Sequence, residues 1–246
     1  MFSFFRKNKN LELFPFHLLK TDMHSHLIPG IDDGSPNVET SFHLMQGLYD
    51  LGYEKLITSP HVMQDLYPNN AYTINNGYSI LKSHWKKDND LPIKPAAEYF
   101  LDDHFFDTAM KGEQLLTIKN NLLLFEISFA SPPLGLREML FELQLKGFEL
   151  ILAHPERYSY MHFNPKKEFE ALKNAGCYFQ CNLLSFSGYY GKPVRDAAEF
   201  LVKEGMVDFL GTDLHHERHL ENLKLLPYTS SLQRLMDSGR IQNASL

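Results

Sequence analysis

The sequence predicts an α/β protein built on a parallel sheet that is either open or closed into a barrel. About seven short apolar runs alternate along the 246-residue chain with segments of helical spacing, a pattern typical of repeated βα units. Polar residues of the types that bind metals follow most of these runs. No repeat, low-complexity run or linker divides the chain. We therefore expect a single domain over residues 20–246, preceded by a leader at 1–19.

The expected strands are apolar runs that end in polar turns. The first begins at Thr21, and the others cover residues 55–58, 93–99, 121–127, 148–153, 178–182 and 207–210. The run at 121–127 is continuously apolar up to its acid, which is typical of a strand covered on both faces.

The expected helices have apolar residues at three- and four-residue steps. The first begins near Pro36, since proline is favoured in the first turn of a helix, and ends at Gly52. The other helices are expected at about 72–87, 134–146, 166–174, 194–204 and 230–238.

Composition narrows the class of protein. The formal net charge is −6, which argues against a dedicated nucleic-acid binder, and no apolar run approaches the roughly 18–20 residues of a membrane span. The aromatic and basic N-terminus lacks the residue order of a signal peptide. Cys177 and Cys181 would lie about 13 Å apart on a strand, too far for a disulfide, so we expect both in the core. These features indicate a cytoplasmic protein.

Residues of metal-binding types lie close after the predicted strands. Because the carboxyl ends of parallel strands share one face of a βα barrel, these side chains should converge. The candidates number nine: His24, His26, Asp33, His61, Glu98, Glu126, His154, Asp213 and His215. A single histidine at a strand end is usually only a polar cap, but this many together predict a centre of two or three metal ions.

The first stretch of the site is a His-x-His pair. A strand would point the rings of His24 and His26 to one face, roughly 6–7 Å apart, which suits two ligands of one ion. The other seven histidines are expected to face solvent: His17, His43, His84, His104, His162, His216 and His219.

Three arginines are candidates for binding an anion near the ions. Arg157 follows His154 by three residues and carries a planar fork of donors that matches phosphate. Arg218 and Arg195 are alternatives for the same role, and a plain surface charge is the competing interpretation for both.

Several of these stretches carry a resemblance to a known family. From about Asp22 to Arg218, the chain resembles the PHP (polymerase and histidinol phosphatase) superfamily. Within it, the chain is similar to the bacterial metal-dependent protein-tyrosine phosphatases of the CpsB/CapC/YwqE type, found with capsule and exopolysaccharide loci. The stretches H-S-H-x-x-P-G-x-D-D-G and H-P-E-R-Y are specific to that branch. The pairs H-x-H and D-x-H alone are shared by many metallohydrolases.

The resemblance implies a distorted (β/α)7 TIM-like barrel, the PHP fold, with three divalent metal ions. Manganese is the implied metal, with iron, zinc, cobalt and magnesium as alternatives. The implied ligands of the first ion are His24, His26, Glu98 and Asp213. The second ion shares Glu98 and is completed by Glu126 and His154. The third is held by Asp33, His61 and His215.

Two of these ligand assignments leave alternatives open. Asp33 is preferred to Asp32 because it matches the second acid of the family. Glu98 has Asp102 and Asp103 as neighbouring alternatives. Arg157 matches the phosphate-binding arginine of the family, whereas Arg218 corresponds only loosely to a later one.

The resemblance also implies the activity, that of a phosphoric monoester hydrolase acting on phosphotyrosine with metal-activated water. The implied substrate is the Tyr-rich C-terminal tail of a bacterial tyrosine kinase that controls polysaccharide synthesis. Two alternatives remain, a small-molecule phosphatase of the histidinol-phosphate kind and a non-catalytic metal-binding barrel. The chain has no Cys-x5-Arg phosphatase loop, which argues against a phosphocysteine intermediate. The oligomeric state, including a homo-oligomer, is left open.

Overall fold

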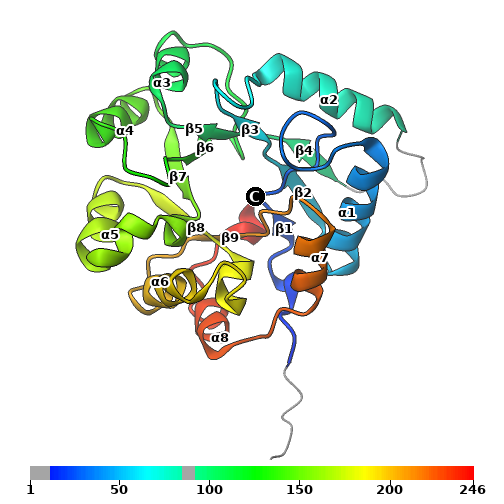
Figure 1. Cartoon of the computed structure of the whole chain (residues 1–246), viewed down its shortest axis with the longest axis vertical. Coiled ribbons are helices and arrows are strands. Elements are labelled where there is room, and N and C mark those ends of the chain that lie inside the picture. The colour runs from blue at the N-terminus through cyan, green and yellow to red at the C-terminus, as the bar shows by residue number, and fades with distance from the viewer. Residues whose placement is uncertain (1–11, 85–91) are drawn as a thin grey trace, which may run out of the picture.

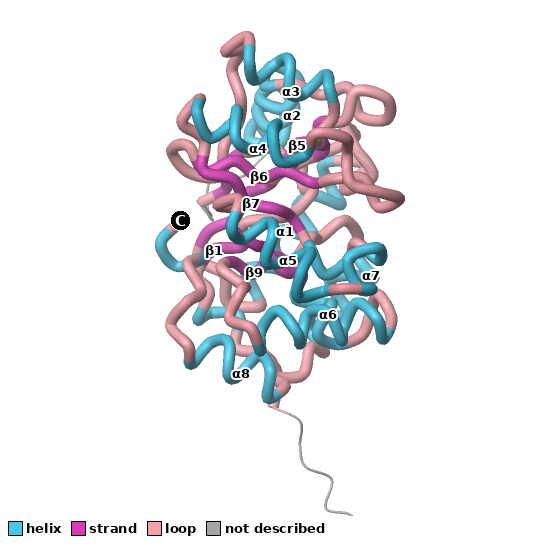
Figure 2. Tube along the Cα trace, turned by 90° about the vertical axis from the view of Figure 1, so that its left-hand side faces the viewer, coloured by secondary structure: helices cyan, strands magenta, loops and turns pink. Residues whose placement is uncertain are grey.

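The computed structural model describes residues 12–84 and 92–246. Helices surround a central set of strands, and a view turned by 90° places the strands in the interior (Figures 1 and 2). The first residues of the expected leader (1–11) and the last residues of the second expected helix (85–87) lie outside the described part.

The strands form two sheets, and every pair within them is parallel. The smaller sheet has the order β1 (Thr21–Asp22), β2 (Lys55–Thr58) and β4 (Ile93–Pro95). The larger has the order β3 (His61–Val62), β5 (Glu98–Phe100), β6 (Leu122–Glu126), β7 (Glu149–Ala153), β8 (Tyr178–Asn182) and β9 (Phe209–Gly211). The predicted α/β class with parallel strands is confirmed.

The smaller sheet is joined to the larger one on both sides. On one side, β2 runs on into β3 and β4 into β5, with Ala96 N donating to Thr58 O at 2.7 Å and Glu98 N to Pro60 O at 3.1 Å across the transition. On the other side, Asp213 N donates to His24 O at 2.8 Å, and His26 N to Leu214 O at 2.9 Å. The candidate ligands after β1 and β9 are therefore held together by the backbone itself.

The helices are α1 (Val38–Asp50), α2 (Ala71–His84), α3 (Asp103–Met110), α4 (Leu136–Leu145), α5 (Pro165–Asn174), α6 (Lys192–Lys203), α7 (Glu217–Lys224) and α8 (Ser230–Asp237). The sequence patterns indicated all of these except α3 and α7. The expected start of α1 near Pro36 is wrong by two residues, because Asn37 caps the helix by accepting from Thr40 N.

The strand predictions differ from the structure at one place of functional weight. The run at 93–99 is interrupted at Ala96 and Ala97, so that it forms β4 and then β5. The new strand starts at Glu98, which is fully buried. The interruption thus turns a candidate ligand toward the interior.

The strands are buried on both faces. Leu124 of β6 belongs to an inner cluster that includes Met23, Ile57 and Phe209, while its neighbours Leu123 and Phe125 belong to the larger core packed under the helices. This alternation is the two-residue period of a strand.

The described end of the leader packs onto the body of the protein. Phe14 N donates to Leu226 O at 2.9 Å, and the Phe14 ring makes an edge contact with Tyr228 at 5.7 Å. Phe14, Phe16 and Leu19 are buried. In the described residues, no helix has both the length and the apolar character needed to cross a membrane.

Candidate metal centre

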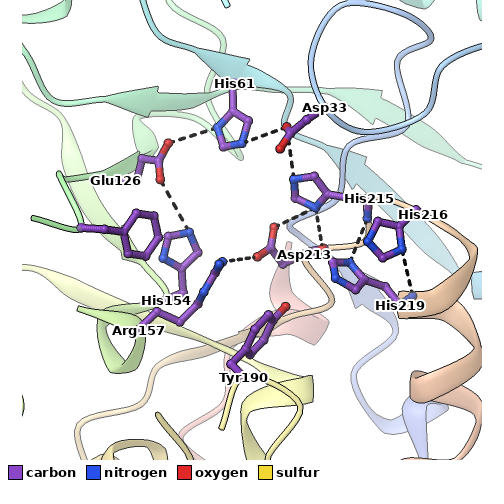
Figure 3. Close-up of a pocket in the computed structure, with 11 residues that line it drawn as sticks. Asp33, His61, Glu126, His154, Arg157, Tyr190, Asp213, His215, His216 and His219 are labelled. Carbon is purple, nitrogen blue, oxygen red and sulfur yellow. Dashed lines mark hydrogen bonds and ion pairs between the residues drawn. The ribbon is translucent and has the colours of Figure 1, made fainter. Parts of the chain in front are cut away.

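The predicted ligands gather at one end of the strands. They contribute to a pocket of about 250 Å³ (Figure 3). The pocket is lined by Asp33, His61, Glu126, Phe129, His154, Arg157, Tyr190, Asp213, His215, His216 and His219. The remaining predicted ligands, His24, His26 and Glu98, are fully buried against these side chains.

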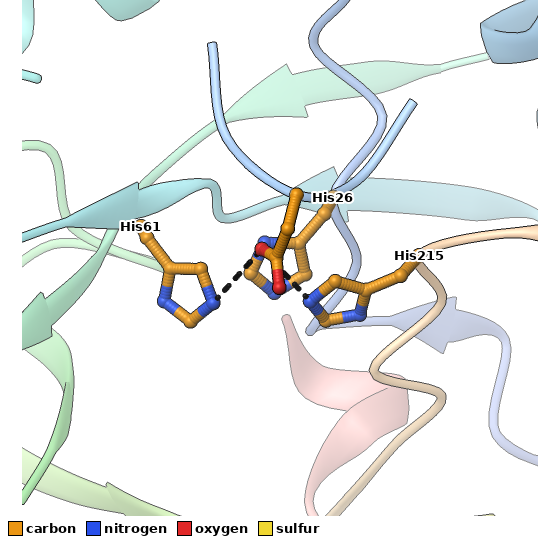
Figure 4. A group of neighbouring side chains, drawn as sticks. His26, His61 and His215 are labelled. Carbon is orange, nitrogen blue, oxygen red and sulfur yellow. Dashed lines mark ion pairs between the residues drawn. The ribbon is translucent and has the colours of Figure 1, made fainter. Parts of the chain in front are cut away.

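Three groups of side chains have ligand atoms within 4.8 Å of one another. The first is His26, Asp33, His61 and His215, which Figure 4 shows from one side. The second is His24, His26 and Asp213, and the third is His61, Glu98 and Glu126. His26 and His61 each belong to two groups, so the groups are contiguous.

Glu98 lies at the centre of these groups. Its Oε2 is 3.2 Å from His24 Nε2 and 3.1 Å from His61 Nδ1, and its Oε1 is 3.1 Å from His154 Nε2. Within the described residues, neither oxygen makes a hydrogen bond of good geometry. A buried carboxylate surrounded by three imidazoles is suited to bridge cations.

The two acids that competed with Glu98 have other positions. Asp102 is the N-cap of α3 and accepts from Phe105 N at 2.7 Å. Asp103 is exposed in the first turn of the same helix. Neither belongs to a candidate metal group.

Asp32 and Asp33 divide two tasks between them. Asp33 Oδ1 lies 3.5 Å from His61 Nε2 and 3.6 Å from His215 Nε2, in the position of a ligand. Asp32 is instead bonded to its neighbours, with its Oδ2 2.8 Å from His26 Nδ1 and 3.1 Å from His61 N. Asp32 therefore orients ligands, and Asp33 is free to be one.

Glycine is required in the turn that carries these two acids. A Cβ on Gly34 would lie 2.3 Å from His26 O and 2.4 Å from His26 Cβ. Ser35 N also donates to His26 O at 3.0 Å. The turn therefore folds directly back onto the His-x-His stretch, which brings Asp33 over the pocket.

The carboxylates of the centre favour positive charge on its histidine rings. Burial lowers the pKa of His24, but the carboxylates of Glu98 and Asp213 outweigh it and raise this pKa to about 10. Burial likewise lowers the pKa of His61, but Glu98, together with Glu126, outweighs burial and raises this pKa to about 10. Burial raises the pKa of Glu98, but His24 and His61 hold it well below its usual range. Metal ions must therefore compete with protons for these side chains.

The geometry of the histidine rings suits the binding of a metal ion. His24 Nδ1 lies 2.7 Å from Gln180 Oε1, and His26 Nδ1 lies 2.8 Å from Asp32 Oδ2. Oxygen acceptors at Nδ1 leave Nε2 of each ring as the ligand atom. The two Nε2 atoms are only 3.3 Å apart and both face Asp213, an arrangement that calls for a proton or a cation between them.

Two candidate ligands occupy left-handed backbone conformations. The φ angles are 36° at His154 and 51° at Asp213, where side chains other than glycine are uncommon. Both residues follow directly or closely after a strand, β7 and β9. Such backbone is typical of residues that the surrounding structure holds in a functional orientation.

Arg157 forms one side of the pocket. Its Nη1 donates to Asp213 Oδ2 at 2.9 Å, and its guanidinium carbon lies 4.5 Å from the Tyr190 ring centre and 5.1 Å from that of Phe129. The guanidinium is therefore held in place by one carboxylate and two aromatic rings, with further N–H groups left for an anion.

Comparison with known proteins identifies the family. The family model described as capsular polysaccharide synthesis, CpsB/CapC, matches residues 20–237. The chain belongs to the CpsB/CapC family.

Two curated relatives of this CpsB/CapC-family protein are tyrosine-protein phosphatases by name. YwqE of Bacillus subtilis is 25% identical over 196 residues, covering 79% of this chain and 77% of YwqE. CpsB of Streptococcus agalactiae is 26% identical over 202 residues, covering 79% and 82%.

Solved structures support the fold. One from the study of Bacillus subtilis YwqE and Streptococcus pneumoniae CpsB, described as metal-dependent tyrosine phosphatases, has a TM-score of 0.77 at 24% identity, covering 92% of this chain and 90% of that one. The phosphotriesterase homology protein of Escherichia coli, solved with phosphate in its active site, has a TM-score of 0.50 at 15% identity, covering 92% and 94%.

The other predicted anion-binding arginines lie away from the pocket lining of the CpsB/CapC-family protein. Arg218 is exposed on α7, with its guanidinium carbon 5.7 Å from the Tyr189 ring centre. Arg195 lies on α6, 4.0 Å from carboxylate oxygens of Asp196 and Glu199.

The expectation that His219 faces solvent is wrong. His219 is only 8% exposed and lines the pocket together with the exposed His216. Burial, with a contribution from His216, lowers the pKa of His219 to about 4. No pattern in the sequence reveals this position, because the direction of the His219 side chain depends on a helix that begins at Glu217.

Sequence patterns also missed the residues that support the ligands. Gln180 and Asn182 are amides, a type of side chain that does not stand out as a metal ligand. Asp32 was passed over as a ligand in favour of Asp33. Phe129 and Tyr190 are aromatic residues on loops, which no pattern connects to a pocket. Only their position beside the ligands shows what they contact.

Proposed function

We propose that this protein is a metal-dependent protein-tyrosine phosphatase, a phosphoric monoester hydrolase. The observation that carries the proposal is the convergence of nine His, Asp and Glu ligands and Arg157 at one pocket. Multi-metal centres beside a guanidinium are suited to phosphate esters. The names of the relatives YwqE and CpsB, both tyrosine-protein phosphatases, support the same activity.

The proposed fold is a distorted (β/α)7 TIM-like barrel over residues 20–246, with 1–19 as a leader. If β2 with β3 and β4 with β5 are each counted as one bent strand, seven strands follow one another around the centre. The backbone bonds between Asp213 and His24 and between Ala96 and Thr58 support closure, and so does the ring of helices in Figure 1.

Three divalent ions are proposed to occupy the centre, with manganese as the first choice and iron, zinc, cobalt or magnesium as alternatives. The proposed ligands are His24, His26, Asp33, His61, Glu98, Glu126, His154, Asp213 and His215. When bound, the ions would activate the attacking water and offset the charge of the phosphoryl group. The mixture of imidazole and carboxylate donors suits transition metals.

The residues of the chain would bind and orient the phosphoryl group. Arg157 would donate to its oxygens, and Phe129, Tyr190 and Asp213 keep the guanidinium in position for this contact. A phenol leaves with a pKa near 10, so the reaction depends less on a general acid than hydrolysis of an alkyl ester does. Cys177 and Cys181 are buried, so neither offers a nucleophile to the pocket.

The proposed substrate is a phosphotyrosine protein of the cytoplasm, the Tyr-rich C-terminal tail of a bacterial tyrosine kinase. The family description, capsular polysaccharide synthesis, supports a role in capsule or exopolysaccharide production. The net charge of −6 is consistent with a protein partner and not with nucleic acid.

The test is metal content combined with turnover of a phosphotyrosine peptide. We expect the metal-loaded protein to hydrolyse the peptide faster than histidinol phosphate. His154→Ala and Asp213→Ala should each lower kcat/KM by roughly 100-fold, because each removes a candidate ligand of the centre.

The control is His104→Ala, an exposed histidine on α3. It should keep both metal and activity. Full activity in the His154 and Asp213 variants would contradict the proposal. Preferred turnover of histidinol phosphate would favour the small-molecule phosphatase, and metal binding without turnover would favour a non-catalytic barrel.

A further inference from the structure

His219 forms part of the pocket on the side of α7. Figure 3 shows Arg157 and His219 on either side of Asp213. His219 is almost fully buried, although it belongs to a short helix whose neighbouring residues Glu217 and Arg218 are exposed. Its ring is therefore part of the wall and not of the outer surface.

The orientation of this ring is fixed by its contacts. His215 N lies 3.3 Å from His219 Nδ1 and donates to it. The ring also packs edge to face against Tyr189 at 5.2 Å and against His215 at 5.7 Å, and lies 4.0 Å from the His216 ring. In the described part of the chain, no hydrogen bond of good geometry involves Nε2, and the backbone carbonyl of Asp213 is a further polar neighbour of the ring.

These contacts determine which nitrogen carries the proton. A neutral imidazole has one N–H, and a ring whose Nδ1 accepts a backbone hydrogen bond carries it on Nε2. The pocket therefore contains a fixed N–H donor beside the candidate metal ligands, in addition to the guanidinium of Arg157. Two donors on separate elements that line one pocket are suited to an oxyanion.

Arg218 does not compete for this position. Its guanidinium lies over Tyr189 and is not part of the pocket lining. Successive residues of a helix are rotated by about 100°, so one face of α7 can present His219 or Arg218 to the pocket, but not both. Leu220 and Leu223 are buried next to His219, which fixes the rotation of the helix.

We propose that His219 is a second phosphate-binding residue, whose Nε2–H donates to a phosphoryl oxygen on the side of the pocket away from Arg157. This role of His219 rests on the proposed function, because the molecule that it would bind is a phosphate monoester. It goes further by giving the task of the second donor to a histidine instead of an arginine.

The test uses two substitutions that separate the two nitrogens. His219→Asn places an oxygen near Nδ1, where it can accept from His215 N, but nothing reaches the position of Nε2. His219→Gln reaches that position with an amide N–H. His104→Asn, at an exposed site on α3, is the matched control.

The measurement is the dissociation constant of inorganic phosphate for the metal-loaded full chain, by titration calorimetry, together with metal content. We expect His219→Asn to bind phosphate roughly 10-fold more weakly with unchanged metal content, because it loses a hydrogen bond to a charged group. His219→Gln should recover part of this loss, and His104→Asn should behave as the wild type.

Two results would overturn the role of His219. One is wild-type phosphate affinity in His219→Asn. The other is a loss of metal in both variants, which would show that His219 acts only by positioning His215. If the wild type binds phosphate through His219 but does not hydrolyse a phosphotyrosine peptide, the proposed function fails while the phosphate-binding role stands.

Discussion

At the scale of single residues, a directional chain of hydrogen bonds connects two candidate ligands. His24 Nδ1 lies 2.7 Å from Gln180 Oε1, Gln180 Nε2 donates to Asn182 Oδ1 at 2.9 Å, and Asn182 Nδ2 donates to Asp213 Oδ2 at 2.6 Å. Each amide both accepts and donates, so every member has its partner. The chain fixes the ring of His24 and the carboxylate of Asp213 relative to each other.

The first residue-scale prediction concerns Asp33. Asp33→Ala should lower the metal content of the loaded protein by about one ion per chain, because Asp33 belongs to only one of the three groups of candidate ligands. Elemental analysis after gel filtration would measure this. Asp65→Ala, an exposed acid in a turn, should retain all the metal. Unchanged metal in Asp33→Ala, or loss of every ion, would refute the assignment.

At the scale of elements, the position of α7 depends on a close contact with α1. A Cβ on Gly47 of α1 would lie 2.3 Å from Leu220 Cδ2 and 2.8 Å from Cδ1. Leu220 is fully buried and follows His219 directly. The missing side chain at Gly47 thus lets α7 approach closely enough for His219 to reach the pocket.

An alanine at Gly47 would test this contact. Alanine should stabilise the helix by about 1 kcal/mol relative to glycine, but crowding of a packed core costs about 1–3 kcal/mol. Crowding should win, and Gly47→Ala should lower the free energy of unfolding by about 1 kcal/mol in urea denaturation. In a Leu220→Ala background the crowding is gone, so the same change should stabilise. If Gly47→Ala changes the free energy of unfolding equally in the wild type and in Leu220→Ala, the contact between Gly47 and Leu220 does not limit how closely α7 approaches α1.

At the scale of the whole molecule, the strands pack against the inner cluster on one face and against the helices on the other. Cys181 of β8 and Cys177 just before it are both buried and free. Burial raises the pKa of the Cys177 thiol to about 12 and that of Cys181 well above its usual range. Both side chains are therefore protonated and covered as long as the fold is intact.

Thiol labelling measures this enclosure. At pH 8 the native protein should react with a thiol reagent far more slowly than the urea-unfolded chain, because the thiolate is the reactive form and the native pKa values lie well above 8. The sign follows from the raised pKa: reactivity should rise only as the pH approaches 12 for Cys177. Rapid labelling of the native protein at pH 8 would show that β8 opens readily.

The candidate ligands could be predicted from the sequence because their chemistry is local. His-x-His after Thr21, Asp213-x-His215 and the acids at 98 and 126 each follow an apolar run, and parallel strands bring such positions together. The alternation of strands and helices could be predicted for the same reason, since the strand and helix periods are properties of short segments. Neither α3 nor α7 was predicted, although α8, which has the same length, was.

The sequence by itself determined the fold class and the set of candidate metal-binding side chains. Only the tertiary structure decided which side chains complete the pocket: His219 instead of Arg218, Asp32 as a support beside Asp33, and Phe129 and Tyr190 around Arg157. The physical reason is that the direction of a side chain depends on where its helix begins and how that helix is rotated. For α7, the packing of Leu220 against Gly47 sets this rotation, and that contact joins residues far apart in the chain.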